Sequence, residues 1–135
     1  MSTNNVSLVS CLASGAIVQG TFVYETAMTE GQPTVATATD GTTATAQKII
    51  GMAIEGADDG AQVTVQLFGL FEFARASASV AAGALITSTG SGEFKVAASG
   101  DNALGRLLFG KGASGATADN AEAVVLLFAT PLAIA

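Results

Sequence analysis

The sequence predicts an all-β fold, a small β-barrel or sandwich of about seven or eight short strands with little helix. Half of the residues are hydrophobic, and most of these are Ala, Val, Leu and Ile accompanied by many Gly and Thr. This mixture suits short strands and tight turns. Turn signals separate the apolar runs, and helical periodicity is almost absent. In a chain of 135 residues we expect a flexible arm at 1–5 and a single β domain at 6–135.

The stretch from Ile49 to Phe73, which reads IIGMAIEGADDGAQVTVQLFGLFEF, predicts two strands joined by a hairpin turn. The second strand alternates, and its expected core face carries Val63, Val65, Leu67, Gly69, Phe71 and Phe73. The opposite face begins and ends polar but carries Phe68 and Leu70 at its centre. A solitary small domain would leave these two side chains in water, so we expect them at an oligomer interface.

The N-terminal part contains two expected strand regions and one long segment of unusual composition. Strands are expected near Val6–Ser10 and Ala16–Tyr24. Residues 26–47 are mostly Thr, Ala and Gly, so we expect a long loop with one weak strand near Val35 that adds little to the core. The composition fits either an ordered interaction loop or a disordered linker.

The second half of the chain continues the pattern of short strands and Gly-rich turns. Residues 75–83 predict a loop or one helical turn, and we expect Pro131 to end the last strand. Segments Gly51–Phe68 and Gly105–Phe128 share an order of Gly, apolar strand, Gly-rich turn and apolar strand, which indicates a weak internal repeat. Strands are expected at 85–88, 93–97, 104–109 and 122–128.

Charge and cysteine usage exclude several classes of partner. The net charge is −6 and the five basic residues are scattered, so we expect no nucleic-acid partner. Cys11 is the single cysteine, which excludes an internal disulfide and a multi-cysteine metal site. We expect a structural thiol there, because the residues before it lack the basic start and apolar segment of a lipid-anchor signal. No apolar run reaches the ~18 residues of a membrane helix, so we expect no membrane partner.

Residues for catalysis or metal binding are scarce. The sequence has no His, which removes Ser-His and Cys-His catalytic pairs and histidine metal sites. Asp58-Asp59, Asp101-Asn102 and Asp119-Asn120 are interpreted as turn residues; calcium is the alternative, but the spaced ligands of a calcium loop are missing. The glycines beside Ser91 and Lys111 do not match a phosphate-binding loop. We expect no catalytic residue, no metal site and no cofactor, and therefore no enzyme.

Glycines and short apolar runs recur over about the last two thirds of the chain. They are Gly51-Met52-Ala53, Gly60-Ala61-Gln62-Val63-Thr64-Val65, Gly69-Leu70-Phe71, Ala81-Ala82-Gly83-Ala84-Leu85, Leu104-Gly105-Arg106 and Val124-Val125-Leu126-Leu127. This spacing resembles the phage capsid cement, or head-decoration, proteins, which are small β-rich proteins on the outside of an icosahedral head. The resemblance implies a non-enzymatic virion protein, commonly a homotrimer at three-fold positions, whose partner is the major capsid protein. Residues 26–47 are longer than the connection expected for this family.

We therefore expect a protein on the outer capsid surface that stabilises the head. The arm and the 26–47 segment are the expected reaching elements, because backbone and hydroxyl groups can hydrogen-bond across a partner surface. Capsid contacts are expected at Ser2, Thr3, Asn4, Asn5, Val35, Thr37, Thr39 and Thr42. The alternative is a tail fibre, spike or adhesin-type β subunit that binds a receptor or glycan. Aromatic residues on loops would favour that alternative, but here they fall mostly within strand patterns.

Overall fold

The computed structural model describes residues 8–29, 31–38, 49–110 and 122–134. These residues form ten strands and no helix, which confirms the all-β prediction but exceeds the expected number of strands. The strands are β1 (Leu8–Ala13), β2 (Phe22–Thr29), β3 (Gln32–Thr37), β4 (Ile49–Ala53), β5 (Gln62–Gln66), β6 (Gly69–Arg75), β7 (Leu85–Ser88), β8 (Phe94–Val96), β9 (Asn102–Gly110) and β10 (Glu122–Ala133).

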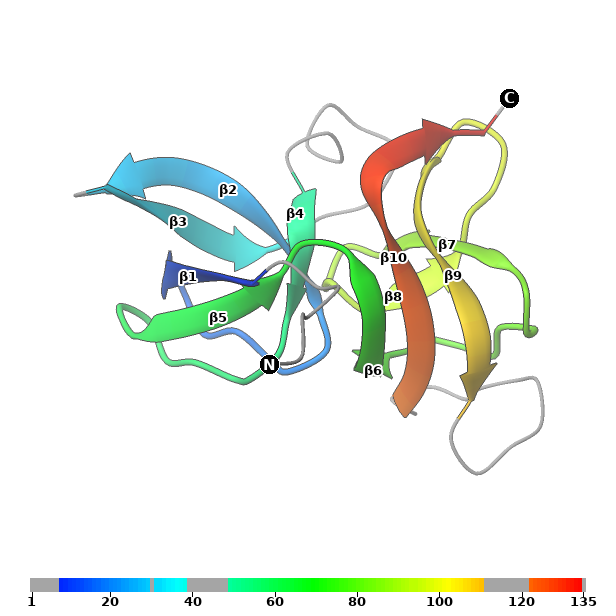
Figure 1. Ribbon diagram of the computed structural model, residues 1–135, viewed down its shortest axis with the longest axis horizontal. Helices are drawn as coiled ribbons and strands as arrows, with labels where there is room; N and C mark the ends of the chain where they lie inside the picture. The colour runs from blue at the N-terminus through cyan, green and yellow to red at the C-terminus, as the bar shows by residue number, and fades with distance from the viewer. Residues whose placement is uncertain (1–7, 30, 39–48, 111–121, 135) are drawn as a thin grey trace, which may run out of the picture.

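The first five strands close into a barrel in the order β1-β3-β2-β4-β5, seen on the left of Figure 1. Strand β1 runs antiparallel to β5, with Cys11 opposite Val63, and parallel to β3, with Ala13 opposite Val35. The barrel interior is filled by small and β-branched side chains: Cys11, Ala13, Ile17, Val23, Val35, Ala53, Val63 and Val65. A five-stranded barrel is narrow, so side chains of this size fill it without large aromatic residues.

The other five strands form a second sheet in the order β6-β10-β9-β7-β8, on the right of Figure 1. A second hydrophobic core includes side chains from both layers, because Phe22 and Met52 come from barrel strands and Phe71 from the sheet. Its largest fully buried members are Phe22, Phe71, Phe94, Met52, Ile86, Leu107, Val80 and Val125. The backbone N–H of Phe22 also donates to the carbonyl of Gly92 at 2.8 Å. Barrel and sheet are therefore joined by both packing and hydrogen bonds.

The predicted strand 63–73 is divided by a corner at Leu67-Phe68, where the chain passes from the barrel to the second sheet. Gly69 has a φ of 96°, a conformation that favours glycine. The buried amide of Gln66 spans this corner, since its Nε2 donates to the carbonyl oxygens of Phe68 at 3.1 Å and Leu70 at 2.8 Å. The Gln66 side chain thus stabilises the turn by which the chain passes from the barrel to the second sheet.

Close backbone approach next to this corner requires a glycine in β4. A methyl group on Gly51 would overlap the carbonyl oxygen of Gln66, and one on Gly105 would overlap that of Leu126. Both glycines lie in strands paired antiparallel with the following barrel or sheet strand, β5 and β10 respectively. The two segments of the weak sequence repeat therefore each begin with a glycine at which the backbone of a neighbouring strand approaches closely.

A bulge in β6 changes the prediction for Phe73. Ala74 lies opposite Ala123 and Phe71 opposite Val125, so Glu72 and Phe73 together face one residue of β10. The extra residue reverses the alternation. Phe73 is consequently 42% exposed, and its expected place in the core was wrong.

The expected long loop at 26–47 is in part a hairpin. Strand β2 extends to Thr29 and pairs with β3, which returns into the barrel. Val35 is fully buried there. The prediction that this segment adds little to the core was therefore wrong for 26–37, because a narrow barrel is filled by Val and Ala. Residues 39–47 and the predicted arm at 1–5 lie outside the described residues.

The expected end of the last strand needs correction. Strand β10 continues to Ala133, so Pro131 does not end it. Between the pairs Leu127 with Gly105 and Leu132 with Ala103, β10 has four residues and β9 has one, and Pro131 lies in this bulge, where no ladder N–H is needed. Residues 76–83 form bends and turns without a helix, which agrees with the loop alternative expected for 75–83. The predicted second hairpin is confirmed as β7 and β8.

The Gln66 corner leads to a stability prediction. Replacing Gln66 with Met keeps the side-chain length but leaves two carbonyls without their donor, which should lower the free energy of unfolding by about 1–3 kcal/mol. Gln62→Met on the exposed end of β5 is the matched control; it removes only an exposed hydrogen bond from the Ser10 hydroxyl, which water can replace, and should change the free energy of unfolding by less than about 0.5 kcal/mol. Urea unfolding measures both. Equal effects would show that the corner hydrogen bonds do not contribute specifically.

Candidate interaction surface

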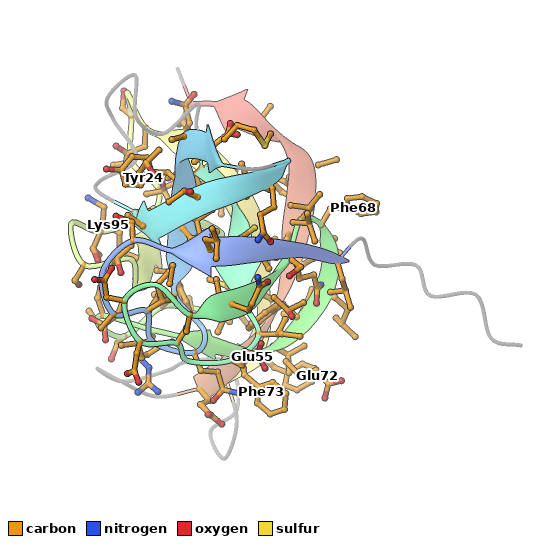
Figure 2. All side chains as sticks on the ribbon, turned by 90° about the vertical axis from the view of Figure 1, so that its left-hand side faces the viewer. Tyr24, Glu55, Phe68, Glu72, Phe73 and Lys95 are labelled. Atoms are coloured by element: carbon orange, nitrogen blue, oxygen red, sulfur yellow. The ribbon has the colours of Figure 1, made fainter. Side chains whose placement is uncertain are left out.

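The corner between barrel and sheet carries the exposed apolar residues that the sequence singled out. Phe68 is 38% exposed and Leu70 is 48% exposed. Leu70 lines a hollow of about 280 Å³ together with Leu8 from β1 and Phe73 from β6. Figure 2 shows Phe68 pointing away from the ribbon at this end, with Phe73 next to Glu72 below it. Contiguous exposed apolar surface of this kind marks an interaction site more often than single exposed residues do.

The apolar surface continues across the second sheet. Leu70 of β6 lies opposite Leu126 of β10, and Leu126 lies opposite Arg106 of β9. Both leucines and Arg106 are exposed, whereas their chain neighbours Phe71, Val125 and Leu127 are buried in the core. On the outer face of this sheet, Leu70 and Leu126 therefore lie in one row with Arg106, and the half-buried Leu85 of β7 follows Arg106 in that row.

A second hollow lies at one end of the barrel. It has a volume of about 540 Å³, and we call it the barrel mouth. Its lining is apolar except for one carboxylate: Val9, Glu25, Pro33, Ile49, Ile50, Leu67, Phe68 and Ala129. Glu25 is half-buried, and within the described residues it forms no ion pair.

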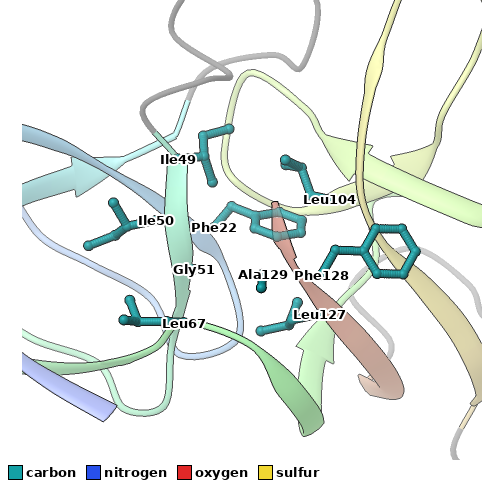
Figure 3. Close-up of a pocket in the computed structure, with 9 residues that line it drawn as sticks. All are labelled: Phe22, Ile49, Ile50, Gly51, Leu67, Leu104, Leu127, Phe128 and Ala129. Carbon is teal, nitrogen blue, oxygen red and sulfur yellow. The ribbon is translucent and has the colours of Figure 1, made fainter. Parts of the chain in front are cut away.

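The barrel mouth adjoins a narrow space between barrel and sheet. Figure 3 shows Ile50 and Leu67 on the barrel side of that space, Phe128 on the sheet side and Phe22 between them. Its volume of about 30 Å³ holds at most one or two waters. This inner space is too small for a ligand, so any guest of the barrel mouth must remain at its open end.

Cys11 and the aspartates have structural positions. Burial, and then the negative charge of Glu25, raise the pKa of the Cys11 thiol. Asp59 Oδ1 accepts a hydrogen bond from Gly15 N at 2.8 Å, and Asp101 Oδ2 accepts one from Ala98 N at 2.8 Å. Their carboxylates hold turns, as predicted, while Asp119-Asn120 lies outside the described residues. No three potential metal ligands cluster in the part of the chain that the structure describes, and no helix there could cross a membrane.

The structure separates the expected contact residues into four groups. Phe68 and Leu70 are exposed, as a contact role requires. Val35 is fully buried inside the barrel, so its side chain cannot reach a partner and that expectation was wrong. Thr37 is half-buried at the end of β3. The other expected capsid contacts lie outside the described residues: Ser2, Thr3, Asn4, Asn5, Thr39 and Thr42.

Sequence reasoning missed Leu8, Phe73 and Leu126 as exposed neighbours of Leu70. A strict alternation could have placed Leu126 outside, because Val125 and Leu127 point into the core. No pattern in the sequence reveals the bulge that exposes Phe73. The barrel mouth was also missed, because its lining comes from segments far apart in the chain.

The sequence matches no family model and no curated protein. Among solved structures, the fold is similar to the N base of the head fibre protein gp8.5 of bacteriophage phi29, with a TM-score of 0.69 and 10% sequence identity. The similarity covers 94% of this chain and 98% of that one. At this identity the likeness concerns the fold.

The buried thiol predicts a pH dependence of stability. The unfolded Cys11 thiol ionises near its ordinary pKa of about 8.5, whereas the folded thiol has a raised pKa. Its contribution to stability is therefore complete below about pH 8 and is lost as pH rises through the folded pKa. Urea unfolding from about pH 7 to 10 should show a steeper fall for the wild type than for Cys11→Ala. Parallel curves would mean that the thiol does not titrate differently in the two states.

Proposed function

We propose that this chain is a structural protein of a phage virion, which sits on the outer surface of an icosahedral head and stabilises its shell. The observation that carries the proposal is the fold likeness, over nearly the full length of both chains, to the base of a phage head fibre. The spacing of Gly and apolar residues, which resembles the head-decoration proteins, supports the same assignment independently. A non-enzymatic role agrees with a sequence that has no His.

We propose further that the protein is a homotrimer whose subunits meet at Phe68 and Leu70. Leu8, Phe73 and Leu126 extend the same surface. Burying each large apolar side chain is worth ~1.5–3 kcal/mol relative to exposure, so several together offset much of the cost of association. A symmetric trimer also multiplies each weak contact with the shell.

The proposed partner is the major capsid protein. Contacts through Ser2–Asn5, Thr37, Thr39 and Thr42 remain part of the proposal, whereas Val35 is removed from it because its side chain lies in the barrel core. Three copies of weak contacts act together once one is seated, because the others then bind at high effective concentration. Such bridging between neighbouring subunits would resist expansion or rupture of the shell.

The second candidate is the base of a fibre that projects from the head. The structural neighbour is the N base of a head fibre, which favours this candidate specifically. The fibre base is therefore a more specific alternative to the capsid-stabilising role than a tail fibre, spike or adhesin subunit. Electron microscopy of particles distinguishes the two, because a fibre base carries density that extends outward beyond the ten-stranded domain.

Oligomeric state is the first test. Light scattering at micromolar concentration should give three times the mass of one chain. The double change Phe68→Asp and Leu70→Asp should yield monomers, because it places charges in a dry interface. Met28→Asp, at a 63% exposed position on the β2–β3 hairpin, is the matched control and should leave the trimer intact. A wild-type monomer throughout this range would overturn the trimer.

Particle stability is the second test. Heads from a phage lacking this protein should release DNA at a lower temperature, or under milder low-salt stress, than decorated heads. Adding purified protein back should restore resistance, and deletion of residues 1–5 should lower the copy number per head without unfolding the domain. Equal resistance with and without the protein would exclude stabilisation and leave the fibre base as the better explanation.

A further inference from the structure

The barrel mouth is a built hollow with contributions from all around the barrel. Val9 comes from β1, Pro33 from β3, Glu25 from β2 and Ile50 from β4, while Leu67 directly follows β5. Its volume of about 540 Å³ lies within the ~300–1,000 Å³ typical of ligand pockets. The barrel mouth is distinct from the hollow lined by Leu8, Leu70 and Phe73. Phe68 lines the barrel mouth only.

The chemistry of the lining specifies the charge of a guest. Seven of the eight lining residues are Val, Pro, Ile, Leu, Phe or Ala, and the eighth is Glu25. The carboxylate is half-buried, forms no ion pair in the described part of the chain, and acts on the Cys11 thiol inside the barrel. A cation brought next to this carboxylate by a bound apolar group would be stabilised by charge attraction.

A second concavity shows in which direction a longer guest would run. A shallow hollow of about 340 Å³ follows β2 along Glu25, Thr26, Ala27 and Met28, and it shares Glu25 with the barrel mouth. Thr26, Ala27 and Met28 are exposed. β4 pairs with β2 only from Phe22 to Tyr24 and does not run along this stretch. An elongated guest can therefore lie along β2 with one end in the barrel mouth.

We propose that the barrel mouth binds an extended peptide segment of a protein partner, in which a large aliphatic or aromatic side chain enters the hollow and a neighbouring Lys or Arg pairs with Glu25. A fatty acyl chain fits the apolar walls, but its carboxylate would be repelled by Glu25. The site itself is argued from this chain alone; only the identity of the partner, a protein of the phage head, rests on the proposed function.

The test uses the isotope-labelled full-length protein and two capped peptides, acetyl-Gly-Leu-Phe-Arg-Gly-amide and the same peptide with Glu in place of Arg. Titration of the Arg peptide should shift the amide NMR signals of Val9, Glu25, Ile50 and Leu67 in a saturable way. The Glu peptide should bind at least about tenfold more weakly, which corresponds to ~1.4 kcal/mol for the charge pair. Sodium decanoate should produce no shift at these positions.

Three variants assign the effect to the site. Glu25→Lys should reverse the preference between the two peptides, whereas Asp58→Lys makes the same charge change on an exposed turn at the opposite end of the barrel and should not. Ala129→Trp, at an exposed rim position, should fill the hollow and weaken both peptides. A thermal melt checks that each variant is folded. If a variant is unfolded, the comparison of the Arg and Glu peptides on the wild-type protein still tests the proposal.

Several results would overturn the proposal. No shifts at millimolar Arg peptide, equal affinity for both peptides, shifts confined to another surface, or binding of decanoate would each exclude the proposed guest. Shifts at Val9, Glu25 and Ile50 that depend on protein concentration without peptide, and that persist in the Phe68→Asp and Leu70→Asp variant, would identify a second copy as the occupant instead. Because heads are absent from this experiment, its failure leaves the capsid proposal to its own test, and the failure of that test leaves the peptide site standing.

Discussion

The passage of the chain from barrel to sheet at residues 66–70 is the constraint on which the rest of the structure depends. A strand that leaves one sheet for another exposes backbone carbonyls at the turn, and buried carbonyls without donors are costly. The Gln66 amide satisfies two of them from inside the same turn. Gly51 lets the adjacent strand approach closely enough for this arrangement to pack. With the corner fixed, Met52 and Phe71 meet in the core between the layers, and Phe68 and Leu70 are left outside.

Alternation of apolar and polar residues predicted the strands well where a strand pairs with its neighbour in the sequence. The pairs β4–β5 and β7–β8 follow from apolar runs around Gly-rich turns, and both are hairpins in the structure. The failures share a different cause. The exposure of Phe73 and the continuation of β10 past Pro131 depend on bulges set by register against a strand distant in sequence. Val35 was misplaced because a narrow barrel fills with side chains that look too small for a core.

The sequence predicted only those residues of the candidate site that depart from the alternation of apolar and polar side chains. Phe68 and Leu70 interrupt a polar face, and this departure from alternation is visible in the sequence alone. The barrel mouth has no such signal, since Val9, Glu25, Ile50 and Ala129 are each ordinary in their own strand. Barrel closure brings Val9, Glu25 and Ile50 together, and the packing of the second sheet against the barrel adds Ala129. A site assembled from many strands is invisible to any pattern read along one of them.

The two surfaces are not independent, because Phe68 belongs to both. It lies at the Gln66 corner two residues before Leu70, is exposed like Leu70, and lines the barrel mouth. If subunits associate through Phe68 and Leu70, the Phe68 ring is held by a neighbour, and one wall of the barrel mouth becomes rigid. A guest segment would then bind without the entropy cost of ordering that wall, so its affinity would rise on trimer formation, and by linkage the guest would strengthen the trimer by the same factor. Assembly and partner binding can thus reinforce each other through a single side chain, which lies at the corner where the Gln66 amide bonds the backbone carbonyls of Phe68 and Leu70.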